Sequence, residues 1–548
     1  MARLVTGARN AGMPAPPGKD AGPKVWLCHI EGRGRRQAVI GARRSGWPLR
    51  DGPLVVTGPA RAGRAGLWLV LVVLAGAALR FATLDVQSLW YDEAITARLL
   101  RMDLSGLLHA IPDSESTPPL YYVLGWVWAH FFGTGEVGLR SLPALLGTAT
   151  IPIVWALGRR LRGERAALLA AGFVALNPLL VWFSQEARAY ALLALLAALS
   201  ALLWLRALEQ PRAGRAAAWS VVAALAVATH YYAIFLVAPQ ALWLVLRARD
   251  VRVRAAALVP LGVALAALAP LALGQRANDS AAFIGDNSLL LRVAQLPKQM
   301  LVGYDAPAEV LLGVLAGVPL VLALAGAWML VARGGGGAAR DDALRLAGIA
   351  AAALILPVLA ALGGEDHLIT RNLLAVVPIG AALAAAGLIT LADRLPALAF
   401  GAVAAACVLA LVAIVGVDTD PELQRDDWRG AVRALGHADG ERLIVATPAS
   451  ALAPLNYYLP TVHKLATGTL VTSEIDYVAL PERSPGERPK PPRPARAPEP
   501  VAGFVQTART QAQTFTVLRL RAALQGVPRA SVATGLDGTT PVLLVAVR

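Results

Sequence analysis

Cysteines and charged residues are scarce in this sequence. Only two of its 548 residues are cysteines, Cys28 and Cys407, and only 16% are charged. Because the two cysteines lie far apart, we expect neither a disulfide framework nor a cysteine-based metal site. The chain also lacks a glycine-rich phosphate-binding loop and any Cys/His spacing typical of a metal site. The net charge is +15, but the basic residues are scattered between apolar runs, which argues against nucleic-acid binding.

The sequence instead contains many long apolar runs. Hydrophobic residues make up 56% of the chain, whereas soluble proteins contain about 45–50%. Runs of Ala, Leu and Val about 20 residues long predict membrane-spanning helices, and we count about 11 of them. The predicted spans are 66–84, 136–158, 166–183, 189–208, 216–231, 233–247, 255–274, 308–332, 344–362, 373–391 and 396–416. The sequence therefore predicts an all-α polytopic membrane protein, with a small C-terminal α/β domain.

Arginines beside the spans predict the orientation in the membrane. Arg61 and Arg64 precede the first span and place the N-terminus in the cytoplasm. The apolar run 118–133 is short for a span, and if it crossed, the Arg-rich loop 159–165 would face outward. We therefore expect this run to form an interfacial or re-entrant helix, within one large outer loop, 85–135, that carries helices at the membrane surface. The same alternation predicts a multi-pass protein of the cell membrane with its C-terminus outside.

Composition divides the chain into three parts. Residues 1–64 are rich in Gly, Pro and Arg, and we expect a disordered, basic cytoplasmic extension. A cleaved signal peptide is not expected, since the first apolar run starts too late. Residues 65–416 form the transmembrane domain. Residues 417–548 form an extracytoplasmic α/β domain that contains a Pro-rich linker, 481–500.

The C-terminal part shows short elements of both kinds. We predict helices over 427–435 and 449–458. We predict strands at 442–446, around 513–521 and over 541–547.

Most of the unusual polar and aromatic residues fall on one predicted side of the membrane. They lie in the large outer loop and in the outer loops 184–190, 230–232, 275–307 and 365–371. A pore would place polar residues through the middle of the bilayer. Clustering at one interface is typical of a site that meets its substrates there.

The residue types on that side are carboxylates, arginines and tyrosines. The outer face of a membrane offers no free nucleotide, so a sugar donor there must be carried by a lipid. Transfer from a polyprenyl phosphate needs a base for the acceptor proton and cations for the departing phosphate. A carboxylate and a guanidinium suit these two roles. No strong general acid is needed, because the lipid phosphate leaves as a stable anion.

Five motifs in this order resemble one enzyme family. They are Trp90-Tyr91-Asp92-Glu93, Thr117-Pro118-Pro119-Leu120-Tyr121-Tyr122, Gly138-Leu139-Arg140-Ser141-Leu142-Pro143, the segment Ser184 to Tyr190 and the segment Thr229 to Tyr232. Together they resemble the family-39 glycosyltransferases, the protein O-mannosyltransferase-like group of the GT-C fold. The lipid A aminoarabinose transferase is a more distant relative. The resemblance covers about 65–415 and implies a GT-C-like transmembrane domain.

The resemblance implies roles for the residues of the first and third motifs. Asp92 matches the general base of the family. Glu93 would orient Asp92 or bind the acceptor, with a surface-helix carboxylate as the alternative. Arg140 matches an arginine at the start of the second span and would pair with the acidic loop as a structural tie.

The remaining motifs imply contacts with the donor. Arg188 and Tyr190 match a loop near the donor, with an interfacial anchor as the alternative. His230 and Tyr231 would line the donor cavity, although an aromatic belt at the membrane interface also explains the tyrosine.

Arginines further along the chain are candidates for phosphate binding. Arg371 is one, although family members tend to have Arg-Tyr where this chain has Arg371 and Asn372. Arg276 and Arg292 are two more. The run 365–367 carries Glu, Asp and His and can in principle ligate a metal. We favour a hydrated loop and expect no cofactor, and an Asp-Glu pair rather than Asp-x-Asp also argues against metal dependence.

The resulting hypothesis is an integral membrane glycosyltransferase. It moves a sugar, mannose or a related hexose, from a polyprenyl-phosphate donor to a protein, lipid or glycan acceptor. A flippase for lipid-linked sugars is a second hypothesis, but it predicts paired charges deep in the spans and symmetry between halves, and neither is evident. A non-catalytic membrane scaffold is a third.

Overall fold

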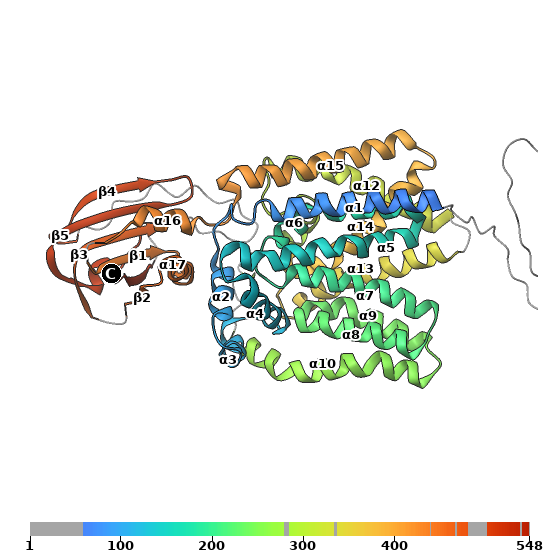
Figure 1. The fold of residues 1–548 in the computed structure, drawn as a ribbon, viewed down its shortest axis with the longest axis horizontal. Coiled ribbons are helices and arrows are strands. Elements are labelled where there is room, and N and C mark those ends of the chain that lie inside the picture. The colour runs from blue at the N-terminus through green and yellow to red at the C-terminus, as the bar shows by residue number, and fades with distance from the viewer. Residues whose placement is uncertain are drawn as a thin grey trace, which may run out of the picture. The chain divides into compact units, whose positions relative to one another are not determined.

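The computed structural model describes residues 59–278, 284–285, 287–333, 337–438, 440–465, 468–480, 501–536 and 540–546. Most of the predicted N-terminal extension and the whole Pro-rich linker 481–500 lie outside the described residues. Helices dominate the first part of the described chain, and a sheet forms the last part (Figure 1).

The described chain is a multi-pass membrane protein. Eight of its helices are long and apolar enough to cross a membrane, and α8 and α9 are shorter apolar helices. The long helices and these two are α1 (Pro59–Phe81), α5 (Glu136–Leu176), α7 (Tyr190–Glu209), α8 (Ala213–Thr229), α9 (Ile234–Arg247), α10 (Val251–Ala277), α12 (Glu309–Arg333), α13 (Ala338–Leu362), α14 (Val377–Ala392) and α15 (Pro396–Thr419). Most predicted spans fall on one of these helices. The span 166–183 falls on the second half of α5 and on α6 (Pro178–Ser184), and 373–391 begins in the 3-10 helix η3 (Thr370–Val376) and continues in α14.

Helix α5 carries two of the predicted spans because the chain reverses inside it. Arg162 and Gly163 leave helical geometry, and Gly163 has φ +72°. That left-handed conformation favours glycine, which has no Cβ to clash. The predicted arginine-rich turn at 159–165 is therefore a sharp corner between two packed helical segments.

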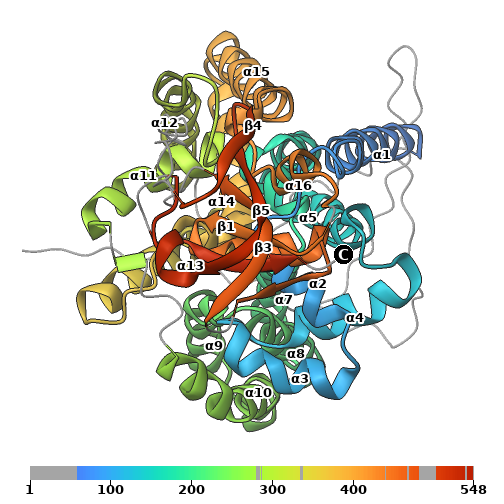
Figure 2. The same cartoon turned by 90° about the vertical axis from the view of Figure 1, so that its left-hand side faces the viewer.

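Three short helices lie across one end of the long ones. They are α2 (Tyr91–Leu100), α3 (Leu104–Ser114) and α4 (Leu120–Phe132), shown in blue to cyan in Figure 2. Each is too short to cross a bilayer, which needs about 20 residues. These are the helices expected within the loop 85–135. The loop 275–307 differs from our expectation, since it contains the helix α11 (Leu289–Val302).

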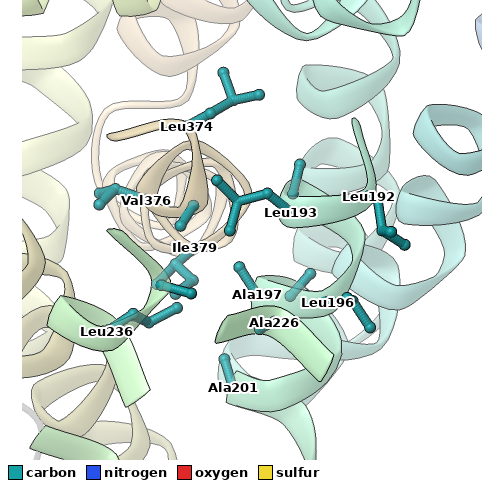
Figure 3. Close-up of a cluster of buried hydrophobic side chains, with 14 of the residues drawn as sticks. Leu192, Leu193, Leu196, Ala197, Ala201, Ala226, Leu236, Leu374, Val376 and Ile379 are labelled. Carbon is teal, nitrogen blue, oxygen red and sulfur yellow. The ribbon is translucent and has the colours of Figure 1, made fainter. Parts of the chain in front are cut away.

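The core of the helical part is built from small and aliphatic side chains. Leu193 and Ala197 of α7, Leu236 of α9 and Ile379 of α14 belong to one buried cluster (Figure 3). Lipid tails are as apolar as these side chains, so close packing rather than transfer from water holds such helices together.

Helices α12 and α14 approach each other through a pair of glycines, Gly326 and Gly387. A Cβ on Gly387 would collide with the carbonyl oxygen of Ala323. We expect Gly387→Ala to force the helices apart and to lower the free energy of unfolding by about 1–3 kcal/mol, the usual cost of overpacking. Gly380→Ala in the same helix is the control, since nothing lies within 4 Å of its Cβ position. Thermal unfolding of the purified variants in detergent measures the difference, and equal melting temperatures would contradict the prediction.

The C-terminal part is a six-stranded mixed sheet with helices. Its helices are α16 (Trp428–Leu435) and α17 (Leu452–Tyr458), and its strands are β1 (Arg442–Thr447), β2 (Val462–Lys464), β3 (Thr469–Ala479), β4 (Val505–Gln511), β5 (Thr516–Pro528) and β6 (Val542–Ala546). The strand order is β2-β6-β1-β3-β5-β4, with β1 parallel to β3 and the other pairs antiparallel. Helix α16, strand β1 and strand β6 match our predictions closely. Strands β2, β3 and β4 were not predicted, and β4 is exposed along its whole length, so it shows no alternation of apolar and polar residues.

Candidate active site

Asp92 and Glu93 occupy the first turn of α2, which begins at Tyr91. Negative charge is favoured at this end of a helix because the unpaired backbone N–H groups carry partial positive charge. Successive residues of a helix point about 100° apart, so the two carboxylates reach different surroundings. The Glu93 side chain is fully buried, whereas 20% of the Asp92 side chain is exposed.

Glu93 is held by Arg140 of α5. The guanidinium Nη2 donates to Oε2 at 2.6 Å and Nε donates to Oε1 at 2.8 Å. Oε1 also accepts the backbone N–H of Ala187 at 2.9 Å. The other N–H groups of Arg140 donate to the carbonyl oxygens of Leu84, Gln87 and Ser88. Arg140 thus fastens the segment before α2 to the helical core.

These contacts bear on the role expected for Glu93. Burial raises the pKa of Glu93, but the charge and hydrogen bonds of Arg140 outweigh burial and leave the pKa below its usual value. Both carboxylate oxygens are engaged, and none of the side chain is exposed. The arrangement therefore favours orientation of the α2 turn over acceptor binding, and it does not fit a surface-helix carboxylate.

Arg188 lies between Asp92 and a third carboxylate, Glu115. Nη1 of Arg188 donates to both oxygens of Glu115, at 2.8 and 2.7 Å, and its Nε lies 3.9 Å from Oδ2 of Asp92. Burial raises the pKa of Glu115, although the charge of Arg188 opposes the increase. Our sequence analysis missed Glu115. Its place two residues before the Thr117 motif was the available signal.

Arg371 approaches Asp92 from another element. It belongs to the 3-10 helix η3 (Thr370–Val376), and its Nη1 lies 3.9 Å from Oδ2 of Asp92. Its backbone N–H donates to the Tyr304 hydroxyl at 2.8 Å. Asp92 therefore lies beside arginines of two different elements.

Tyr190 and His230 lie against each other next to these arginines. Their rings are 5.8 Å apart, and both side chains are buried. Nδ1 of His230 accepts the backbone N–H of Tyr232 at 3.2 Å. Burial, together with the charges of Arg371 and Arg188, lowers the pKa of His230 to about 3. This histidine is therefore neutral at physiological pH and adds no charge to the site.

Tyr231 lies in the 3-10 helix η1 (Tyr231–Ala233) and makes different contacts. Its hydroxyl donates to Oε1 of Gln275 at 2.7 Å, and Nε2 of Gln275 donates to the carbonyl oxygen of Thr117. Hydrogen bonds through Gln275 of α10 therefore link Tyr231 to the Thr117 motif.

A fourth carboxylate, Glu186, lies in the same turn as Arg188 and pairs with Arg425, which follows α15. Nη2 of Arg425 donates to Oε2 of Glu186 at 2.9 Å, and both side chains are buried. Burial raises the pKa of Glu186, and the charge of Arg425 opposes this increase. Sequence analysis did not single out either residue. Nothing in their spacing shows that a turn between α6 and α7 meets a segment so distant in the chain.

The site therefore holds carboxylates and arginines in matching numbers. The close pairs are Glu93 with Arg140, Glu115 with Arg188 and Glu186 with Arg425, and Asp92 lies 3.9 Å from both Arg188 and Arg371. Paired carboxylates with 0–3% exposed side chains are poorly placed to accept a proton from a substrate. Asp92 differs in being loosely paired and partly exposed.

The other phosphate candidates lie in pairs of their own. Arg276 pairs with Glu365, and Nη1 of Arg292 donates to Oδ1 of Asp366 at 2.8 Å. The acidic residues of the run 365–367 thus contact arginines. Among the residues that the structure describes, no three His, Cys, Asp or Glu side chains converge as metal ligands would.

Comparisons with known proteins bear on both the fold and the site. Residues 116–273 match the family described as dolichyl-phosphate-mannose-protein mannosyltransferase. The structure resembles that of ArnT from Cupriavidus metallidurans in the apo state, with TM-score 0.53 and 15% identity over 84% of this chain and 98% of that one. The same protein bound to undecaprenyl phosphate gives TM-score 0.51 and 15% identity over 83% and 98%. A search of curated protein sequences found no match.

The chain has the GT-C fold, and residues 116–273 match a mannosyltransferase family model. The resemblance to the family-39 group and to ArnT is thus supported by a family match that spans four of the five motifs and by the fold. The matched segment of this chain contains Arg140, Arg188 and the pair Tyr190 and His230. Asp92 and Arg371 lie outside it and join the site only through the fold.

Proposed function

We propose that this transferase moves a sugar, mannose or a related hexose, from a polyprenyl-phosphate donor to a hydroxyl group of an acceptor. Asp92 is the general base. The observation that carries the proposal is the position of Asp92, the loosely paired carboxylate of the site, 3.9 Å from two arginines. The family description names a dolichyl-phosphate-linked mannose, and ArnT binds undecaprenyl phosphate, which supports a lipid-linked donor.

The reaction follows from the charges around Asp92. A bond forms between the acceptor oxygen and the anomeric carbon while the bond from that carbon to the donor phosphate breaks. The acceptor proton passes to Asp92, and the phosphate leaves with the electron pair. Direct attack inverts the configuration of the anomeric carbon. The reaction needs no cofactor, because an arginine supplies the positive charge that stabilises the leaving phosphate.

We assign the phosphate role to Arg371, which lies beside Asp92 as Arg188 does. Nη1 of Arg188 already donates to both carboxylate oxygens of Glu115, at 2.8 and 2.7 Å. Arg371 reaches the same side of Asp92 from η3, and its backbone is held by Tyr304. A guanidinium pairs well with phosphate because it presents several N–H donors in one plane.

We place the site at the extracytoplasmic side of the membrane. The end of the long helices opposite Asp92 carries the arginine-rich turns, which favour the cytoplasm. These turns hold Arg159, Arg160, Arg206, Arg215, Arg247, Arg254, Arg340, Arg345 and Arg394. Donor and acceptor would then both meet Asp92 on the far side, where free nucleotide sugars are absent.

The purified protein in lipid nanodiscs tests this proposal with two probes, undecaprenyl phosphate and radiolabelled undecaprenyl-phosphate mannose. We expect the wild type to bind the first. We expect it to transfer label from the second to acceptors in a membrane extract. Failure of the wild type to bind undecaprenyl phosphate would overturn the proposal. If the wild type binds undecaprenyl phosphate but transfers no mannose, we would infer that the donor carries another sugar.

Replacing Arg371 should weaken phosphate binding in the same assay. A hydrogen bond to a charged group contributes about 1.5–3 kcal/mol, so we expect Arg371→Met to raise the Kd for undecaprenyl phosphate by about 10- to 100-fold. Arg276→Met is the matched control, because Arg276 is 65% exposed and pairs with Glu365. Equal effects of the two substitutions would contradict the assignment of Arg371.

A further inference from the structure

We propose that Arg425, in the segment that joins α15 to the C-terminal sheet, is a positioning residue for this active site and acts through Glu186. The inference rests on the proposed function, since it concerns the same site. It gives the C-terminal part of the chain a role in catalysis that its fold does not suggest.

Arg425 connects two segments that shape the site. Its side chain is 4% exposed and lies over the ring of Trp182 in α6, with the guanidinium carbon 4.0 Å from the ring centroid. Nη2 donates to Glu186, just after α6. The backbone N–H and Nη1 donate to Oε1 of Gln87, just before α2, at 3.0 and 3.3 Å. One side chain therefore spans the turn that carries Arg188 and the segment that leads into Asp92.

The turn after α6 depends on this arginine. In the described part of the chain, Arg425 donates the only hydrogen bond recorded to the Glu186 side chain, and Oε1 of Glu186 is buried with no hydrogen-bond partner. The next residue, Ala187, donates its backbone N–H to Glu93. Arg188 follows and contacts Asp92 and Glu115. The consecutive residues Glu186, Ala187 and Arg188 thus include or contact all four carboxylates of the site.

Loss of Arg425 leaves a buried carboxylate without its counter-charge. Breaking a buried ion pair by removing one partner is costly, because the remaining charge stays out of water. The charged groups that act on Glu186 include Arg425, Glu93 and Asp92, and Arg371 interacts with it as a further positive charge. An ionised Glu186 would then repel both Asp92 and an anionic donor. A protonated Glu186 would not, so the defect should depend on pH.

Other contacts keep the C-terminal part attached without Arg425. Ser88 donates to the carbonyl oxygen of Asp426 at 2.5 Å and accepts the backbone N–H of Trp428 at 3.0 Å. The Tyr458 hydroxyl accepts the backbone N–H of Leu89 at 2.7 Å. Arg429 pairs with Glu136 at 2.7 Å. Arg429 also donates to the carbonyl oxygens of Asp85 and Gln87, but it pairs with none of the four carboxylates around Asp92, so it is a matched control for the charge of Arg425.

The experiment compares Arg425→Met, Glu186→Gln, the double variant and Arg429→Met in nanodiscs, with undecaprenyl phosphate as the probe. We expect Arg425→Met to raise the Kd about tenfold at pH 8, the scale of one charged interaction. At pH 5.5 the increase should shrink, because the unpaired Glu186 takes up a proton. The double variant should recover most of the affinity at both pH values, since it removes both charges. Arg429→Met should bind as the wild type does.

Several outcomes would overturn the inference. They are wild-type affinity of Arg425→Met, a double variant that binds no better than Arg425→Met, and equal losses for Arg429→Met and Arg425→Met. Thermal unfolding of the same four proteins separates this inference from the proposed function. If the wild type does not bind undecaprenyl phosphate, the proposed function fails. The Arg425–Glu186 link then stands only if Arg425→Met melts at a lower temperature than the double variant.

Discussion

Asp92→Asn should lower the rate of sugar transfer by about 10²- to 10⁴-fold, the usual contribution of a general base. Asparagine has nearly the shape of aspartate but cannot accept the acceptor proton. Asp92 makes no close ion pair, since Arg188 and Arg371 each lie 3.9 Å from its Oδ2. The substitution should therefore leave the fold and the melting temperature largely unchanged.

The measurement is the initial rate of label transfer from undecaprenyl-phosphate mannose at saturating donor. Asp85→Asn is the control, because Asp85 lies in the same loop with an exposed side chain. A loss of rate with intact binding of undecaprenyl phosphate would separate the base from the phosphate site. Near-wild-type transfer by Asp92→Asn would remove Asp92 from the base role and leave the donor-binding part of the proposal in place.

Glu93→Gln and Arg140→Met should each destabilise the protein strongly. Each leaves one fully buried charge unpaired, which costs about 3–5 kcal/mol in proteins. Arg140 also holds three carbonyl oxygens of the segment before α2, so its loss should be the more severe. We expect lower melting temperatures and lower yields of folded protein, with loss of transfer as a consequence.

The melting temperatures of the single variants and of the double variant Glu93→Gln/Arg140→Met measure this. The double variant should lose less than the sum of the single losses, because neither residue then leaves a buried charge behind. Glu365→Gln, which removes one partner of an exposed pair, should change stability little. A Glu93→Gln variant that is stable but inactive would contradict the structural role and would indicate that Glu93 takes part in the reaction.

These two experiments distinguish adjacent carboxylates that look equivalent in the sequence. Asp92 should affect rate without stability, and Glu93 should affect stability first. The distinction arises because a helix turn directs neighbouring side chains to different surroundings, Glu93 toward Arg140 and the partly exposed Asp92 toward Arg188 and Arg371.

Much of the transmembrane architecture could be predicted because its signals are local. Apolar runs of bilayer length mark helices wherever they occur, and the predicted 136–158 falls on α5 and 373–391 on η3 and α14. The predicted helix over 427–435 is likewise α16. Strand β4 was missed because its residues show no alternation of apolar and polar side chains. Helix α11 is a short amphipathic helix interrupted by Pro297, and it was left within the predicted loop 275–307.

The site was only partly predictable from the sequence. The motifs singled out Asp92 and Arg188, Arg371 was named separately as a phosphate candidate, and the fold brings these three together. Glu115, Glu186 and Arg425 carry no motif that marks them as partners. Each gains its role from one close contact, and the Arg425–Glu186 contact joins residues 239 positions apart.

The sequence by itself determined that this chain crosses a membrane many times and bears acidic and basic residues suited to phosphate-linked sugar chemistry. Hydrophobic length and residue type are properties of short segments, so they can be read without knowing what packs against what. Only the tertiary structure decided which carboxylates are neutralised and which one stays loosely paired. Electrostatic pairing depends on distances of a few ångströms between remote segments, and those distances exist only in the folded chain.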